Sequence, residues 1–181
     1  MPPLPAETET PVWADAYVAR LAALDIETRH REMERFSFPR NIGTLLREAA
    51  AETPEALAWN FFETSETITY AALDRAVDRM AVALASFGVT RGMKVGVMLP
   101  NCPQMPIVWL GLARIGAVMV PVNLRYTGRE LAYVLGDAGA EALVIHDECG
   151  PQYREAVEVA EAGKFPPADR VLRMAADEAQ E

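Results

Sequence analysis

The sequence is poor in the residues that most often carry chemistry. Its 181 residues include only two histidines, two cysteines and three serines, which are Ser37, Ser65 and Ser86. Cys102 and Cys149 lie far apart and form no CxxC pair, a pattern that favours two reduced thiols in a cytosolic protein. None of the serines has the strand-to-helix context of a nucleophile elbow, so a serine hydrolase is not expected.

The chain also lacks an excess of positive charge and a long apolar run. Its net charge of −9 and isoelectric point near 4.8 argue against binding to a nucleic-acid backbone or an anionic membrane surface. The longest apolar stretch, residues 105–122, is interrupted by Arg114 and predicts no transmembrane segment. The start, MPPLPAETET, has neither a basic nor an apolar region, so we expect no signal peptide and a cytoplasmic location.

The familiar nucleotide-binding motifs are missing as well. No GxGxxG and no complete GxxxxGK[ST] loop occurs. Residues 111–116 (GLARIG) have two glycines at the second spacing, but they lie in a predicted helix and no Lys-Ser/Thr follows. Helix packing and capping are the preferred interpretation of both glycines.

Short apolar strands alternate with helical segments between Arg91 and Asp147, at a spacing of about 25 residues. This alternation predicts an α/β fold with a doubly wound, mostly parallel sheet and flanking helices. The expected strands are 93–99, 117–120, 141–146 and a short one at 171–172, with helices over 103–115, 128–138 and 152–162. Gly116 and Gly139 are expected to cap the first two of these helices, Pro121 to stop the second strand, and Thr127 to open a capping box with Glu130. The 103–115 helix is apolar nearly all round, which predicts burial.

The N-terminal part has a different pattern. Residues 1–10 are rich in Pro and Glu and are expected to be disordered, and 11–35 are expected to form a helical arm. A helix capped by Asn41, a hairpin with strands 56–62 and 67–69, and a long helix over 70–87 follow. Asp74 and Asp78 are expected on the wet face of the long helix, and Gly88 is expected as its left-handed cap. We therefore divide the chain into 1–40, a disordered start and helical arm, and 41–181, an α/β part.

Ligands of open parallel sheets bind outside the carboxyl ends of the strands. These ends carry Asn101, Asn123 and His146-Asp147. The two asparagines either meet a ligand or bond their own backbone in a turn, and the turn is favoured. His146 with Asp147 and Glu148 lacks the spacing of known metal sites, so we interpret His146 as a loop residue at the rim of the sheet.

Six short segments carry a recognisable wording. They are Thr67–Leu73 (TITYAAL), Gly88–Gly92 (GVTRG), Val95–Asn101 (VGVMLPN), Gly116–Asn123 (GAVMVPVN), Tyr126–Leu131 (YTGREL) and Asp137–Val144 (DAGAEALV). In this order and spacing they resemble segments of the adenylate-forming acyl-CoA synthetases, and the resemblance covers about residues 41–147. Met93 stands where the family usually has Asp. The resemblance implies that residues 41–181 are an incomplete N-terminal α/β subdomain of such an enzyme.

The resemblance implies an ATP-dependent carboxylic acid–CoA ligase, with ATP, coenzyme A and Mg²⁺ serving the complete enzyme. Such enzymes convert an acid to an acyl-adenylate and pass the acyl group to coenzyme A, for example in fatty acid metabolism. The family's phosphate loop, acyl pocket and catalytic Lys follow the region matched here. The resemblance therefore places no catalytic, cofactor-binding or metal-ligating residue on this chain, which is expected to be inactive alone.

Other interpretations remain open at this point. The chain is either the N-terminal third of such a ligase, partnered by the remainder of the synthetase, or a stand-alone, non-catalytic interaction module derived from the family. An unrelated flavodoxin-like domain is a third alternative. The segment 11–38 is a candidate subunit contact of a homo-oligomer.

Overall fold

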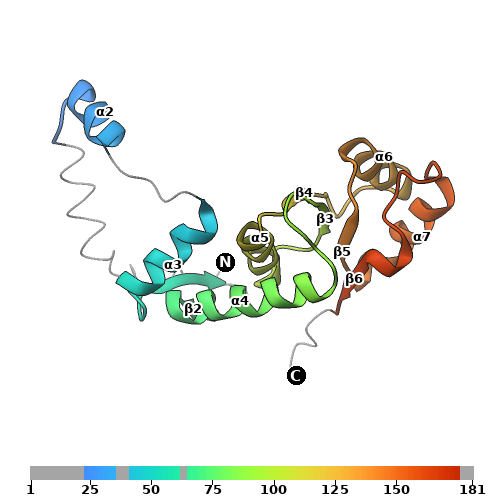
Figure 1. The fold of residues 1–181 in the computed structure, drawn as a ribbon, viewed down its shortest axis with the longest axis horizontal. Helices are drawn as coiled ribbons and strands as arrows, with labels where there is room; N and C mark the ends of the chain where they lie inside the picture. The colour runs from blue at the N-terminus through green and yellow to red at the C-terminus, as the bar shows by residue number, and fades with distance from the viewer. Residues whose placement is uncertain (1–22, 36–40, 62–64, 176–181) are drawn as a thin grey trace, which may run out of the picture. The chain divides into compact units, whose positions relative to one another are not determined.

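The structure is a computed structural model that describes residues 23–35, 41–61 and 65–175 (Figure 1). The chain divides into two compact units, residues 1–38 and residues 39–181. In the first unit, helix α2 (Ile26–Arg35) lies within the predicted arm, and the Asp25 carboxylate accepts a hydrogen bond from the Thr28 N–H at its start. The rest of the predicted arm and the predicted disordered start lie outside the described residues.

The second unit begins with a helix, a hairpin and a long helix. Helix α3 (Ile42–Glu52) starts after Asn41, whose side-chain oxygen accepts from the Thr44 N–H at 2.8 Å, which confirms the predicted cap. Strands β1 (Leu57–Phe61) and β2 (Glu66–Thr69) pair antiparallel as predicted. Helix α4 (Tyr70–Ser86) follows, and Gly88 takes the expected left-handed conformation with φ of 94°.

A four-stranded parallel sheet forms the centre of the second unit. Its strands are β3 (Lys94–Met98), β4 (Val118–Pro121), β5 (Ala142–His146) and β6 (Val171–Met174), in the spatial order β4-β3-β5-β6. All three neighbouring pairs are parallel, which confirms the predicted fold class. The sequence order and the spatial order differ because the connection from β4 to β5 passes over β3, so β4 and β5 pair with opposite sides of that strand.

Two helical layers cover the two faces of the sheet (Figure 1). On one face, α4 and α5 (Gln104–Ile115) pack on Val95, Val97 and Val144. On the other, α6 (Gly128–Ala138) and α7 (Gly150–Val159) pack on alternate strand residues, among them Met98, Leu143 and Ile145. A third cluster joins α3, α4 and α5 through Leu46, Leu73, Val77 and Leu110. Alternation of strand side chains between two apolar layers is what a doubly wound sheet requires.

Local sequence patterns predicted most helix ends correctly. Thr127 and Glu130 form the predicted capping box, and Gly116 and Gly139 end α5 and α6 in left-handed conformations. Helix α7 begins two residues before the predicted 152 and ends three before the predicted 162. A 3₁₀ turn, Asp147–Cys149, leads into it, and Pro151 occupies its first turn, where a missing N–H costs nothing.

Two structural predictions were wrong in detail. Pro121 does not stop β4 but is its last residue. The Val118 and Val122 N–H groups donate to the Met93 and Val97 carbonyls, so even-numbered residues of this segment direct their N–H toward β3. Pro121, an odd-numbered residue, faces away from β3, where a strand residue needs no N–H. Helix α5 is not buried all round, because Trp109 is 42% exposed. Among the described helices, none combines the length and apolarity needed to cross a bilayer.

Candidate functional site: the carboxyl edge of the sheet

The loops that follow β3, β4 and β5 lie along one edge of the sheet, because these strands are parallel and adjacent. The loops after β3 and β4 bring Asn101 and Asn123 to that edge, and His146 is the last residue of β5 at the same edge. Such edges are the usual ligand-binding position of doubly wound folds. The residues at the edge therefore form the candidate site, and each has a different local environment.

Asn123 holds its own loop together. Its side-chain oxygen accepts a hydrogen bond from the Arg125 N–H at 2.9 Å, two residues further on. This contact is an Asx turn, which confirms the favoured interpretation. Asn123 is exposed, so this residue lies at the surface of the edge.

The loop after β3 begins α5. The Cys102 N–H donates to the Pro100 carbonyl at 2.9 Å, and the Met105 N–H donates to the Cys102 carbonyl at 3.1 Å. Asn101 is exposed and Cys102 is half-buried in this turn. The site at this position consists of a solvent-facing amide beside a partly accessible thiol.

His146 is not the rim loop residue that the sequence suggested. It is the last residue of β5 and is 7% exposed, paired in register with Met174 of β6. β5 ends at His146, as predicted, but the strand buries this last residue rather than leaving it at the rim. Its Nδ1 lies 3.7 Å from a carboxylate oxygen of Glu148, a distance that gives an ion pair only when the imidazole is protonated. Within residues 23–35, 41–61 and 65–175, no group of three or more His, Cys, Asp or Glu side chains is placed to hold a metal ion.

Cys149 ends the 3₁₀ turn that follows His146 and is 4% exposed. Burial raises the pKa of its thiol, and the nearby negative charge of Glu148 raises it further. A thiol with a raised pKa forms little thiolate near neutral pH. Cys149 is therefore a structural residue of the edge rather than a nucleophile.

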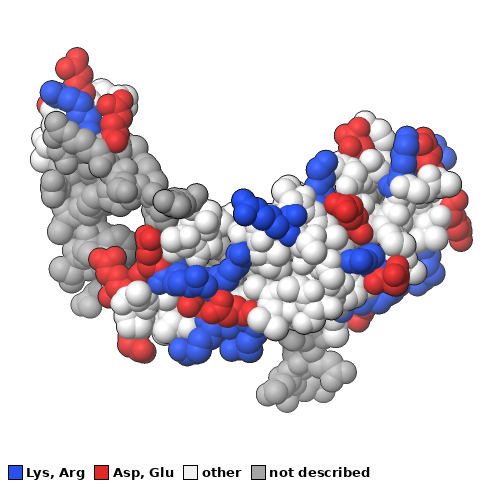
Figure 2. Space-filling model, viewed as in Figure 1, with Lys and Arg blue, Asp and Glu red and all other residues white. Residues whose placement is uncertain are grey.

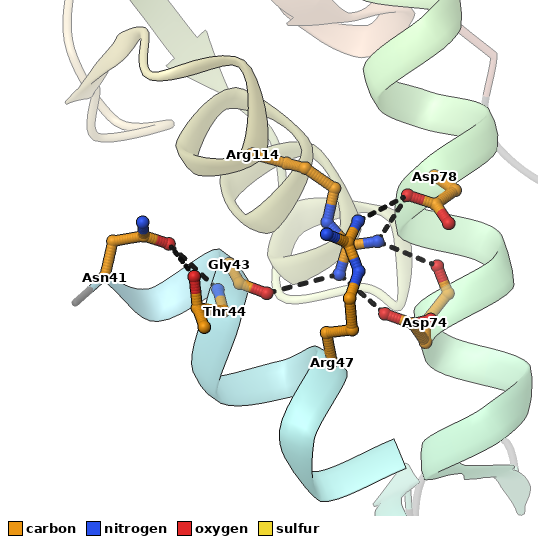
Figure 3. A network of polar contacts seen from close by, with 7 residues as sticks. All are labelled: Asn41, Gly43, Thr44, Arg47, Asp74, Asp78 and Arg114. Atoms are coloured by element: carbon orange, nitrogen blue, oxygen red, sulfur yellow. Dashed lines mark hydrogen bonds and ion pairs between the residues drawn. The ribbon is translucent and has the colours of Figure 1, made fainter. Parts of the chain in front are cut away.

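A polar cluster that the sequence analysis missed joins α3, α4 and α5 (Figure 3). The Arg114 side chain is 9% exposed, and its guanidinium pairs with Asp74 at 2.6 Å and with Asp78. It also donates to the Gly43 carbonyl of α3 at 3.4 Å. Asp74 and Asp78 were expected only on a wet helix face. Asp78 is exposed as expected, with 53% of its side chain accessible, whereas Asp74 is 20% exposed. Both flank Arg114, because α5 lies against that side of α4.

The charge of Arg114 is maintained despite its burial. Desolvation alone would lower its pKa, but the hydrogen bonds to Asp74 and Asp78 and the negative charges of these two carboxylates together outweigh it and raise the pKa. Arg47 of α3 adds an outer contact, 3.5 Å from Asp78, with most of its side chain exposed. The signals present in the sequence were a single cation in an apolar helix and two acids four residues apart. The cluster is structural, and it explains why α5 tolerates a charge.

The glycines of the GLARIG segment are packing and capping residues. Gly111 lies inside α5, and a Cβ there would come within 3.0 Å of the Met80 side chain and 3.3 Å of the Ala81 nitrogen. Gly116 is the left-handed cap. Neither glycine lies in a loop that leads from a strand into a helix, so this segment cannot act as a phosphate loop.

A surface groove of about 360 Å³ lies between α6 and the end of α7, lined among others by Arg129, Asp137, Glu161 and Lys164. Both signs of charge are interspersed over these helices on the face shown in Figure 2. Lys164 and Glu161 pair at 2.5 Å, and this hydrogen bond raises the pKa of Lys164. The mixed charge selects neither an anionic nor a cationic ligand, so the groove is a weaker candidate than the carboxyl edge.

Comparison with protein families gives a match over most of the chain. The family described as AMP-binding enzyme matches residues 46–180. Crotonobetaine/carnitine–CoA ligases of Salmonella paratyphi B and Salmonella typhimurium are each 40% identical over 98 residues, 52% of this chain and 19% of theirs. The chain thus spans about a fifth of the length of the curated relatives that it matches.

Solved structures give the same picture. The inhibitor-bound N-terminal domain of FACL13 from Mycobacterium tuberculosis superposes with a TM-score of 0.66 and 29% identity, over 77% of this chain and 34% of that domain. A fatty acyl CoA synthetase from the same organism superposes with a TM-score of 0.65 and 29% identity, over 76% of this chain and 26% of the synthetase. The predicted resemblance is confirmed at the level of family and fold.

Proposed function

This chain belongs to the AMP-binding enzyme family, and we propose that it is the N-terminal part of an ATP-dependent acyl-CoA ligase. The observation that carries the proposal is the family match over residues 46–180. The 40% identity to crotonobetaine/carnitine–CoA ligases favours a ligase that uses coenzyme A within that family.

In the proposed reaction, a carboxylate oxygen of the substrate attacks the α-phosphorus of ATP, and pyrophosphate leaves. The sulfur of coenzyme A then attacks the acyl carbonyl carbon, and AMP leaves with the carboxylate oxygen. Positioning of the carboxylate and stabilisation of phosphoryl charge supply the rate acceleration in such chemistry. ATP, coenzyme A and Mg²⁺ belong to the complete ligase.

The described residues do not fit these groups, and we assign no step of the reaction to this chain. They offer no cluster of three metal-ligating side chains, and the GLARIG glycines serve helix packing and capping. The chain alone is therefore proposed to be inactive. Its contribution is the scaffold, which fixes the three loops at the carboxyl edge of the sheet.

The organisation follows from the same proposal. Residues 41–181 form an incomplete N-terminal subdomain and residues 1–40 a separate arm, in a cytoplasmic enzyme whose acid pocket lies in the remainder of the synthetase. Short- and medium-chain, aryl and carnitine-like acids are the substrate classes to screen. The remainder of the synthetase is the proposed partner, and the arm is a candidate contact of a homo-oligomer.

The test is expression of the complete reading frame beside the 181-residue chain. Each protein is assayed for ATP–pyrophosphate exchange with a panel of these acids, and active acids are then followed to the thioester by mass spectrometry. We expect exchange from the longer protein and none from the 181-residue chain. A matched preparation without acid measures background exchange.

Two results would contradict the proposal. A longer protein that folds but exchanges pyrophosphate with none of the acids is not a ligase of this class. A reading frame that stops after Glu181 would favour the stand-alone, non-catalytic module instead.

A further inference from the structure

The two edges of the parallel sheet are formed by β4 and β6, and they are unequally covered. Along β4, Val118 is 49% exposed, Val120 is half-buried and Val122 is buried. These three alternate residues lie on the α6 side of the sheet, because Val120 pairs in register with Gly96, whose Cβ position faces Leu135 of α6. On this face, the exposure of the β4 side chains therefore increases from Val122, just after the carboxyl end of the strand, to Val118 at its start.

The β6 edge has cover on both faces. Val171 packs with the α6–α7 cluster, and Leu172 and Met174 pack with the α4–α5 cluster. Its remaining residue, Arg173, lies 5.2 Å from the centre of the Tyr153 ring. A charged residue on an edge strand protects it from further association. β4, with the sequence VMVP, carries no charge.

Trp109 is an exposed apolar residue on the opposite face of the sheet, which α4 and α5 cover. In α5, Gly111 contacts Met80 of α4, and Val108 and Leu112 pack on the sheet. At 3.6 residues per turn, Trp109 lies nearly opposite Gly111 on the helix, on the flank turned away from α4. Helix α5 contacts β4, the outer strand on this side of the sheet, and Trp109 is 42% exposed.

The backbone of β4 limits what can cover it. The residues whose N–H groups point to β3 are Val118 and Val122, so Met119 and Pro121 direct their backbone outward. Proline has no N–H, which leaves Met119 as the only outward donor of this strand. Such an edge is blunted against a further hydrogen-bonded strand, which favours contact through packing of side chains.

We propose that the surface made of Val118, Val120 and Trp109, called the β4 surface below, is an internal interface that packs against apolar side chains of a later segment of the same ligase polypeptide. The inference rests on the proposed function. The aligned part of this chain corresponds to 34% of the FACL13 N-terminal domain and 19% of the curated ligases, so most of such a domain lies outside the matched part. Apolar surface at the edge of a partial domain is the expected position for the missing part.

The test compares thiol accessibility in the 181-residue chain and in the protein from the complete reading frame. Val118→Cys is the probe, and Val157→Cys on α7 is its control, because the two valines are 49% and 51% exposed. Maleimide labelling is followed peptide by peptide, so the native cysteines do not interfere. We expect similar rates for both thiols in the short chain. In the long protein, labelling at position 118 should slow by about tenfold or more, and labelling at position 157 should not change.

Hydrogen exchange on the unsubstituted proteins gives a second measurement that does not depend on the variants. The peptide covering residues 117–122 should exchange more slowly in the long protein, while the central strand β5 should be protected in both. Equal labelling at position 118 and equal exchange of this peptide would overturn the inference. So would a reading frame that ends at Glu181. Protection in the short chain that rises with protein concentration would identify a second copy as the occupant and would also overturn it.

Pyrophosphate exchange by the same long protein separates this inference from the proposed function. A protein that exchanges pyrophosphate but leaves position 118 accessible retains the ligase proposal and loses the β4 surface. A protein that protects position 118 but activates none of the acids retains the interface and loses the ligase proposal.

Discussion

The two helical layers hold together by different means. On the α4–α5 face, an arginine with a 9% exposed side chain joins three helices through two carboxylates and a carbonyl. On the α6–α7 face, the helices meet through a close glycine contact, and the ion pair between Lys164 and Glu161 is exposed. Ion pairs of similar length therefore differ in their contribution to stability. Water can replace the partner of the exposed Lys164–Glu161 pair, whereas the buried Arg114 must be paired within the protein.

The largest effect is expected from Arg114→Met, which keeps most of the side-chain volume and removes the charge. Asp74 would then be left largely buried without its partner, at a cost of about 3 kcal/mol in the free energy of unfolding. Urea denaturation followed by circular dichroism measures this. Arg47→Met is the matched control: it also contacts Asp78, but its side chain is 62% exposed, and a loss of about 0.2–1 kcal/mol is expected.

The double variant Arg114→Met, Asp74→Asn sharpens the same test. It removes the uncompensated charge together with its partner, so it should recover part of the lost stability. Equal losses of stability in the Arg114 and Arg47 variants would show that the buried cluster contributes no more to stability than an exposed ion pair. The two helical layers would then not differ in this way.

Gly128→Ala should have the largest effect in the α6–α7 layer. A Cβ at this position would lie 2.4 Å from the Glu155 Cβ and 2.6 Å from the Ala156 nitrogen, so α6 and α7 would have to separate. We expect a loss of about 2 kcal/mol in urea denaturation. Gly150→Ala is the control, since Gly150 also begins a helix but a Cβ there meets its nearest atom at 3.4 Å. That variant should be neutral or slightly stabilising, and a loss as large as that of Gly128→Ala would contradict the close-contact explanation.

Thr127→Ala removes the side-chain half of the capping box of α6. The Thr127 hydroxyl accepts from the Glu130 N–H, and loss of such a cap costs about 1 kcal/mol. Thermal unfolding should show the decrease. Thr127→Ser keeps the hydroxyl and should retain most of the stability; an equal loss in both variants would indicate a role for the methyl group instead.

Glu130 gives the capping box a pH dependence. Hydrogen bonds from the Thr127 N–H and hydroxyl lower the pKa of Glu130 below its ordinary 4.5. A lowered folded-state pKa stabilises the protein above pH 4.5, and this contribution is lost as the pH falls through the folded-state pKa. The stability difference between the unsubstituted chain and Glu130→Gln should therefore shrink when urea denaturation is repeated at decreasing pH. A difference that stays constant across this range would contradict the cap geometry.

The smallest expected effect concerns the two thiols, one at the start of each layer. Cys102 is half-buried before α5, and Cys149 is buried before α7 with a raised pKa. Ellman's reagent at pH 8 should therefore react with Cys102 about tenfold faster or more. The rates should converge in urea, which serves as the control. Equal rates in the folded protein would mean that the Cys149 turn opens readily.

The sequence predicted what depends on near neighbours. Asn41, Thr127 and Gly139 act on backbone groups within three or four residues, so the ends of α3 and α6 followed from local patterns. The alternation of apolar segments predicted the parallel sheet, and the ordered motifs predicted the family. Predictions failed where the outcome depended on distant contacts. Examples are the burial of His146, the last residue of β5, beside β6, and the exposure of Trp109 on an apolar helix.

By itself, the sequence determined the elements, their caps, the alternation of buried side chains and the membership of the AMP-binding enzyme family. Only the tertiary structure decided that Arg114 meets Asp78 and Gly43, which lie 36 and 71 residues away in the chain, and that β4 becomes an edge strand. The physical reason is that caps and periodicity involve groups already held close by the backbone. Ion pairs and edges depend on which surfaces the whole chain brings together.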